Sequence, residues 1–138
     1  NLTLQIACLT DDYTDYTGRY VGHNEAPALF RHKGKYYMIT SGCTGWAPNA
    51  ARLLVADSIM GEWTLLGNPC RGADAELTYH SQSTFILPVA DKKGNERFIF
   101  MADRWKPEQH THSTYVWLPV RFDENGIPYL RWQDNRQE

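Results

Sequence analysis

A glutamate and a glutamine open two similar apolar runs, and their types and spacing suggest chemistry. Glu25 precedes Ala26–Phe30, and Gln82 begins a comparable run about 57 positions later. A carboxyl group on a rigid strand can donate a proton as a general acid. Pro27 should stiffen the chain beside Glu25 and bias Ala26 toward an extended conformation. The alternative is a Glu25 that only ends a strand in a solvated channel.

Two tryptophan-bearing loops could complete a binding site around these residues. The segment from Ser41 to Asn49 is rich in Gly and polar residues, and it could present Trp46 as a stacking platform and Thr44 or Asn49 as hydroxyl-binding groups. A second loop, residues 103–107, again combines a Trp with hydrogen-bonding side chains. Binding sites usually assemble on loops at one end of a rigid scaffold. The alternative for each Trp is a lid over the core.

The elements that position these residues are expected to be strands, because no stretch keeps a helical apolar period. The first predicted set is Ala26–Arg31, Lys35–Ser41, Ala51–Asp57 and Glu62–Leu66. The second is Ser83–Val89, Arg97–Asp103, Thr114–Phe122 and Pro128–Trp132. Two four-stranded meanders of this size match the blades of a β-propeller, and a β-sandwich is the structural alternative. The predicted division is 1–24 as the end of a preceding blade, 25–72 as one blade and 73–138 as the next.

Composition excludes several functional classes. The 14 basic and 16 acidic residues include no cationic cluster that could follow a phosphate backbone, so no nucleic acid is predicted as a partner. No apolar run is long enough to predict a membrane span. The three cysteines allow at most one disulfide. The five histidines are scattered, and His110–His112 would alternate sides as in a strand. We therefore predict no metal and no cofactor.

Several motifs together resemble one known family. They are Glu25-Ala26-Pro27-Ala28, Lys33-Gly34-Lys35-Tyr36-Tyr37, Thr40-Ser41-Gly42-Cys43-Thr44-Gly45-Trp46, Ala56-Asp57-Ser58-Ile59 and Ser81-Gln82-Ser83-Thr84. This set resembles glycoside hydrolase family 43, and within it the galactan 1,3-β-galactosidase-like branch. The resemblance implies a five-bladed β-propeller, of which this chain would supply about two blades and a remnant of a preceding one, as the C-terminal portion of the catalytic domain.

The resemblance also implies an activity and a set of roles. The reaction would be inverting hydrolysis of β-linked galactose, or a related sugar, in plant polysaccharide. Glu25 would be the general acid and Gln82 would position the attacking water, although a neutral amide is a poor base. Family members of this kind are commonly exported, which implies a periplasmic or extracellular location. The implied sugar contacts, chosen by loop placement, are Thr44, Trp46, Asn49, Asp103 and Trp105.

The sequence departs from the usual family pattern in one respect. Most of the family takes a base Asp and a second Asp from the two blades before the acid, and this chain contains neither blade in full. The alternative function is therefore a carbohydrate-binding or structural propeller piece without turnover. Such a piece would bind an oligosaccharide, associate with itself or pair with the missing blades.

Overall fold

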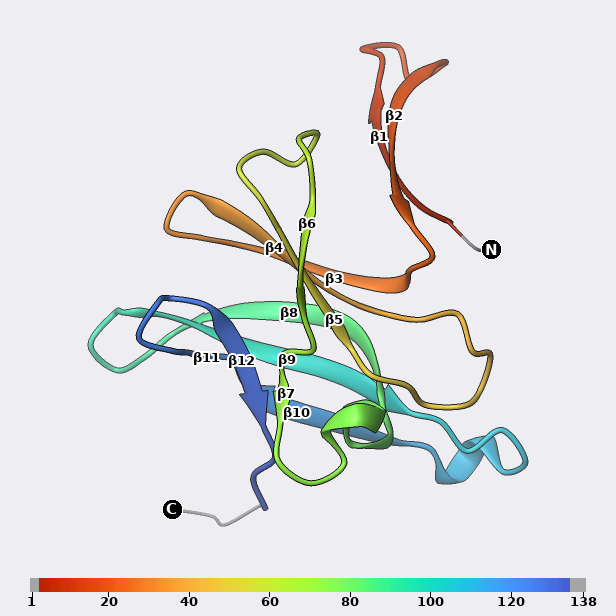
Figure 1. Ribbon diagram of the computed structural model, residues 1–138, viewed down its shortest axis with the longest axis vertical. Coiled ribbons are helices and arrows are strands. Elements are labelled where there is room, and N and C mark those ends of the chain that lie inside the picture. The colour runs from red at the N-terminus through yellow and green to blue at the C-terminus, as the bar shows by residue number, and fades with distance from the viewer. Residues whose placement is uncertain (1–2, 135–138) are drawn as a thin grey trace.

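The computed structural model describes residues 3–134, in which the strands form four small sheets (Figure 1). The first sheet is the hairpin of β1 (Thr3–Leu9) and β2 (Tyr16–Gly22), which projects from the rest of the molecule. Its base packs through Leu4, Ile6 and Val21 on Met38 and Leu54 of the neighbouring sheet. The all-β prediction is confirmed.

The second sheet corresponds to the first predicted meander. It contains β3 (Glu25–His32), β4 (Lys35–Ser41), β5 (Arg52–Ala56) and β6 (Thr64–Gly67) in sequence order, all antiparallel. The β3–β4 connection is a two-residue loop in which Lys33 and Gly34 both have positive φ, 47° and 83°. This geometry matches the twist of the flanking strands. It sets the register from His32–Lys35 to Ala28–Ile39, and a bulge between Ala28 and Glu25 then shifts the pairing so that Glu25 lies opposite Ser41.

The second predicted meander is divided between two sheets. One contains β8 (Gln82–Ala90), β9 (Glu96–Arg104) and β10 (Thr114–Pro119) in the order β10-β9-β8. The other contains β11 (Arg121–Phe122), β12 (Pro128–Arg131) and the short β7 (Cys70–Arg71). The predicted strand Thr114–Phe122 divides because its last two residues pair with β12 instead of β9.

The partner of β12 on its other side is unexpected, because β12 runs parallel to β7, about 60 residues earlier in the chain. Leu130 lies opposite Cys70, and the Leu130 N–H donates to the Pro69 carbonyl at 2.9 Å. Strand β12, which belongs to the second predicted meander, therefore pairs with the segment that follows the first one.

A single core joins the β3–β6 sheet to the β8–β10 sheet, because β3 packs against β8 and both contribute buried side chains, and it also includes Leu130 of β12. Its largest fully buried members include Ile39, Leu53, Ile86, Phe100 and Leu130. One continuous core means that the ends of β3 and β8 are held in a fixed relation. Within the described residues, no helix is long and apolar enough to cross a bilayer.

Two local predictions are wrong. Ala26 is not extended: its φ is 52°, and a bulge interrupts the β3–β4 pairing between Glu25 and Ala28. The extended bias imposed by the following proline is overridden here, and the Ser83 hydroxyl donates to the Ala26 carbonyl at 2.6 Å. His110–His112 forms a short 3₁₀ turn and not a strand.

Candidate active site

The two residues that open the matching strands are in direct contact. The Gln82 side-chain amide donates to Glu25 Oε1 at 3.0 Å and to the Ser41 hydroxyl at 2.9 Å. Ser41 ends β4 opposite Glu25, and Gln82 lies opposite Asp103 on β9. The core that joins β3 to β8 therefore brings a carboxyl group and an amide, far apart in sequence, to one half-buried point.

Gln82 and Ser41 line a cleft of about 950 Å³, whereas Glu25 is not one of its lining residues and meets the cleft through its contact with Gln82. Five of the seven predicted site residues line the cleft, namely Trp46, Asn49, Gln82, Asp103 and Trp105. The rings of Trp46 and Trp105 meet edge to face, with their centroids 5.5 Å apart. The two loops therefore do converge, and both exposed indoles form one wall of the cleft and not a cover for the core.

Asn49 and Thr44 are engaged within their own loop. The Asn49 amide accepts from the Gly42 N–H at 2.8 Å and donates to the Gly42 carbonyl and to the Thr44 hydroxyl. The Thr44 hydroxyl in turn donates to the Ala47 carbonyl at 2.6 Å. These bonds shape the loop that carries Trp46. Thr44 lines a separate depression with Cys43 and Arg52, so its predicted sugar contact stays a prediction.

Several residues of the cleft were missed by the sequence analysis. Ser41, Tyr79, His80, Arg104 and Trp132 all line it. Ser41 could have been found, because it ends a predicted strand directly opposite Glu25. Tyr79 and Arg104 gave no such signal, since their contacts come from distant parts of the chain.

Burial controls the ionisation of Tyr79, which lines the cleft, and of its neighbour Cys70. It raises the pKa of the Cys70 thiol to about 12 and also raises the pKa of the adjacent Tyr79 hydroxyl. Both groups are therefore neutral near pH 7. All three cysteines are free thiols. No group of three His, Cys, Asp or Glu side chains suited to a metal ion occurs in the described part of the chain.

A carboxyl–amide pair beside paired indole rings defines a cleft suited to sugars, because indoles offer flat apolar faces with a polar edge. No family model and no curated protein matches the chain. Among solved structures, the chain is similar to a family 43 β-1,3-galactosidase determined with galactodeoxynojirimycin. Identity is 56%, the TM-score is 0.86, and the match covers 99% of this chain and 40% of that one.

Two further solved structures are similar to this chain. Each match covers 94% of this chain and 29% of the chain in the solved structure. One is an exo-β-1,3-galactanase from Clostridium thermocellum, with 36% identity and a TM-score of 0.76. The other is an exo-β-1,3-galactanase from Phanerochaete chrysosporium determined with β-1,3-galactotriose, with 30% identity and a TM-score of 0.77.

The chain therefore belongs to glycoside hydrolase family 43, and its relatives are enzymes of β-galactan degradation. It spans well under half the length of these relatives.

Proposed function

We propose that this chain is part of the catalytic domain of an inverting, exo-acting glycosidase that removes galactose from β-linked galactan. Glu25 protonates the leaving oxygen, and Gln82 holds the attacking water. The observation that carries the proposal is the 3.0 Å contact of Glu25 with Gln82, which lines an aromatic cleft. The names of the solved relatives support galactan as the substrate class.

The direct contact has a consequence for the mechanism. Inverting hydrolysis places water and sugar between its two working groups, which are roughly 6.5–9.5 Å apart in such enzymes. The Gln82–Glu25 hydrogen bond must therefore open when substrate enters the cleft. Because an amide is a poor base, Gln82 orients water and does not by itself remove its proton.

The test is Glu25→Gln in the full-length natural polypeptide. Hydrolysis of galactan, which has a poor leaving group, should fall by about 100-fold or more. A galactoside with a dinitrophenol leaving group needs no protonation and should keep most of its turnover. Glu124→Gln, at an exposed position in a turn, is the matched control and should leave both rates unchanged. Unimpaired galactan hydrolysis by the Glu25 variant would end the assignment.

A second candidate function is sugar binding without turnover. It is favoured by the neutral amide of Gln82, because an amide is a poor base at the position that would hold the water. Calorimetric titration with β-1,3-galactobiose, followed by product analysis of the same sample, separates the two. Heat of binding without release of galactose selects the binding module.

The proposed architecture is a five-bladed propeller in which 25–72 and 73–138 are consecutive blades and 1–24 ends the preceding one. Residues 1–2 and 135–138 of these ranges lie outside the described residues. The exposed outer face of the β8–β9–β10 sheet supports this arrangement, because a further blade would cover it. Export to the periplasm or cell exterior belongs to the same proposal, and cell fractionation tests it.

A further inference from the structure

A left-handed turn immediately precedes Gln82. Thr78, Tyr79 and His80 have φ values of 51°, 56° and 61°, and the chain becomes extended at Ser81. Consecutive non-glycine residues rarely adopt this region, because each Cβ crowds the following carbonyl oxygen. A branched residue such as Thr78 is especially unfavourable there. The contacts around the turn must stabilise it, and backbone strain of this kind is concentrated at functional sites.

Thr78 is anchored at both its side chain and its carbonyl. Its hydroxyl donates to the Asn49 carbonyl at 2.6 Å, which ties the turn to the loop that carries Trp46. The Ser81 hydroxyl donates back to the Thr78 carbonyl at 2.6 Å. The turn is thus closed on itself and fixed to one wall of the cleft.

Tyr79 ties the turn to the parallel β7–β12 pair. Its side chain is 2% exposed, and its hydroxyl lies 3.1 Å from the carbonyl oxygens of Arg71 on β7 and Leu130 on β12, to one of which it donates. The same hydroxyl accepts from the Arg71 N–H at 3.1 Å. One phenol therefore bridges both strands of the parallel pair.

Arg104 completes the restraint from β9. Its guanidinium donates to the Tyr79 carbonyl at 2.6 Å and lies over the Trp132 ring. Its buried Nε has no hydrogen-bond partner among the described residues. Arg104 therefore gives up one hydrogen bond while it holds the carbonyl of a strained residue.

We propose that Tyr79 and Arg104 are positioning residues for Gln82. The turn they hold sets the direction in which β8 begins, and the ladder to Asp103 sets its register. Together these restraints aim the Gln82 amide at Glu25. The expected effect of these two residues on turnover rests on the proposed function. Their expected effect on the position of the Gln82 amide does not.

The decisive variant is Tyr79→Phe in the full-length polypeptide, with Tyr37→Phe as the matched control. Tyr37 is similarly buried, 5% exposed, and its hydroxyl forms no hydrogen bond in the described structure. The readout is the Gln82 side-chain amide signal in a proton–nitrogen correlation spectrum, assigned by its loss in Gln82→Ala. Tyr79→Phe should shift this signal and Tyr37→Phe should not. For galactan, kcat should fall about tenfold or more while KM stays within about twofold.

A second pair of variants covers the outcome in which Tyr79→Phe does not fold. Arg104→Leu should shift the Gln82 amide signal and lower kcat, and Arg104→Lys, which retains a donor, should restore both toward wild type. If neither Tyr79→Phe nor Arg104→Leu moves the signal in a folded protein, the positioning role is wrong. If the wild type binds sugar without turnover, the proposed hydrolysis fails, and the amide signal alone still decides the positioning.

Discussion

At the scale of single residues, the contact of Gln82 with Glu25 depends on the neutral charge of the Gln82 amide as much as on its position. Its amide can donate to Glu25 and to Ser41 simultaneously, which a carboxylate could not do. A second carboxylate at this half-buried position would face Glu25 with like charge, and one of the two would have to bind a proton. The amide thus holds the acid in place without competing for its proton.

Gln82→Glu tests this interpretation through pH. We expect the variant to lose about 1–3 kcal/mol of unfolding free energy relative to wild type at pH 7. The deficit should shrink near pH 4, where protonation removes the repulsion. Urea denaturation at both pH values measures it, and Gln133→Glu, at an exposed site, serves as the control. An equal deficit at both pH values would show that charge is not the cause.

The cysteines should differ sharply in reactivity. Burial raises the pKa of Cys70 to about 12, so roughly one molecule in 10⁴ carries its thiolate at pH 8. Cys8 is exposed on the projecting hairpin. A disulfide-exchange reagent should label Cys8 rapidly and Cys70 only after unfolding, and Cys8→Ser should abolish the fast phase. Stoichiometric labelling of Cys70 in the native protein would contradict the burial.

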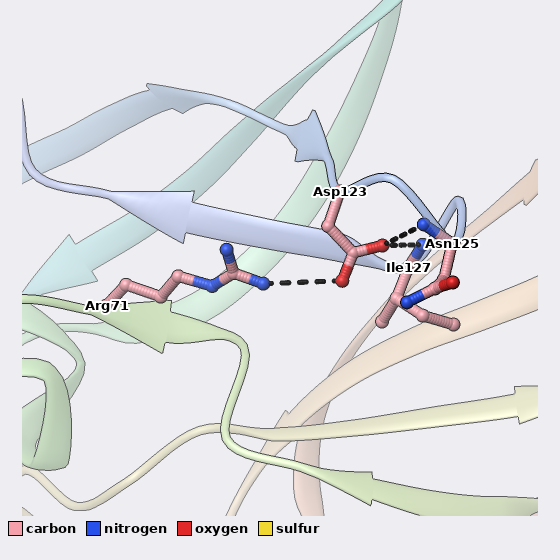
Figure 2. Close-up of polar contacts among 4 residues, drawn as sticks. All are labelled: Arg71, Asp123, Asn125 and Ile127. Carbon is pink, nitrogen blue, oxygen red and sulfur yellow. Dashed lines mark hydrogen bonds and ion pairs between the residues drawn. The ribbon is translucent and has the colours of Figure 1, made fainter.

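At the scale of elements, aspartates build two of the hairpin turns. Asp91 accepts from the backbone N–H groups of Lys93 and Asn95 between β8 and β9. Asp123 accepts in the same way from Asn125 and Ile127 between β11 and β12, and its other oxygen meets Arg71 of β7 at 3.4 Å (Figure 2). The second turn therefore also fastens the parallel β7–β12 pair.

Substitution of Asp123 should separate these two contributions. Asp123→Ala loses both backbone bonds and should lower the unfolding free energy by about 1–3 kcal/mol. Asp123→Asn keeps a carbonyl oxygen for the turn and should lose less than about 1 kcal/mol, because the Arg71 contact is long and partly exposed. Chemical denaturation gives both values, with Glu124→Ala as the control. Equal losses for Ala and Asn would assign the stability to the ion pair.

The elements that sequence could predict are those set by local pattern. The hairpin at Lys33 and Gly34 follows from a turn signal between two predicted strands. The repeat predicts strand starts at Ala26 and Ser83, and each strand begins one residue earlier in the structure. The parallel pairing of β12 with β7 could not be predicted, because nothing near Leu130 specifies a partner 60 residues away. The left-handed turn at Tyr79 lacks the glycine that usually marks positive φ.

At the scale of the whole molecule, one sheet face lacks a covering layer in the described structure. On the β8–β9–β10 sheet, Tyr115 is 77% exposed and Trp117 62%, with Phe85 also exposed. Contiguous aromatic surface of this kind marks an interaction site. We expect a further blade of the same propeller to cover it in the full-length polypeptide.

Light scattering on the isolated chain tests this expectation. Its apparent mass should rise with concentration, because the bare face self-associates, and Trp117→Lys should reduce the rise. The full-length polypeptide should keep a constant mass, and the same substitution there should lower its thermal stability instead. A chain that stays monomeric at every concentration would indicate that the face is intrinsically solvated.

The bridge from Tyr79 to Leu130 also dictates when the site can mature during synthesis. β3, β4 and β8 leave the ribosome well before β12, yet the turn that aims Gln82 is fastened to the last of these strands. Contacts between residues so far apart in the sequence form only after the loop between them has closed, at a cost in entropy that local contacts do not carry. A nascent chain that has emerged only as far as β8 therefore lacks the Leu130 carbonyl, and the turn before Gln82 gains this contact only after β12 has emerged.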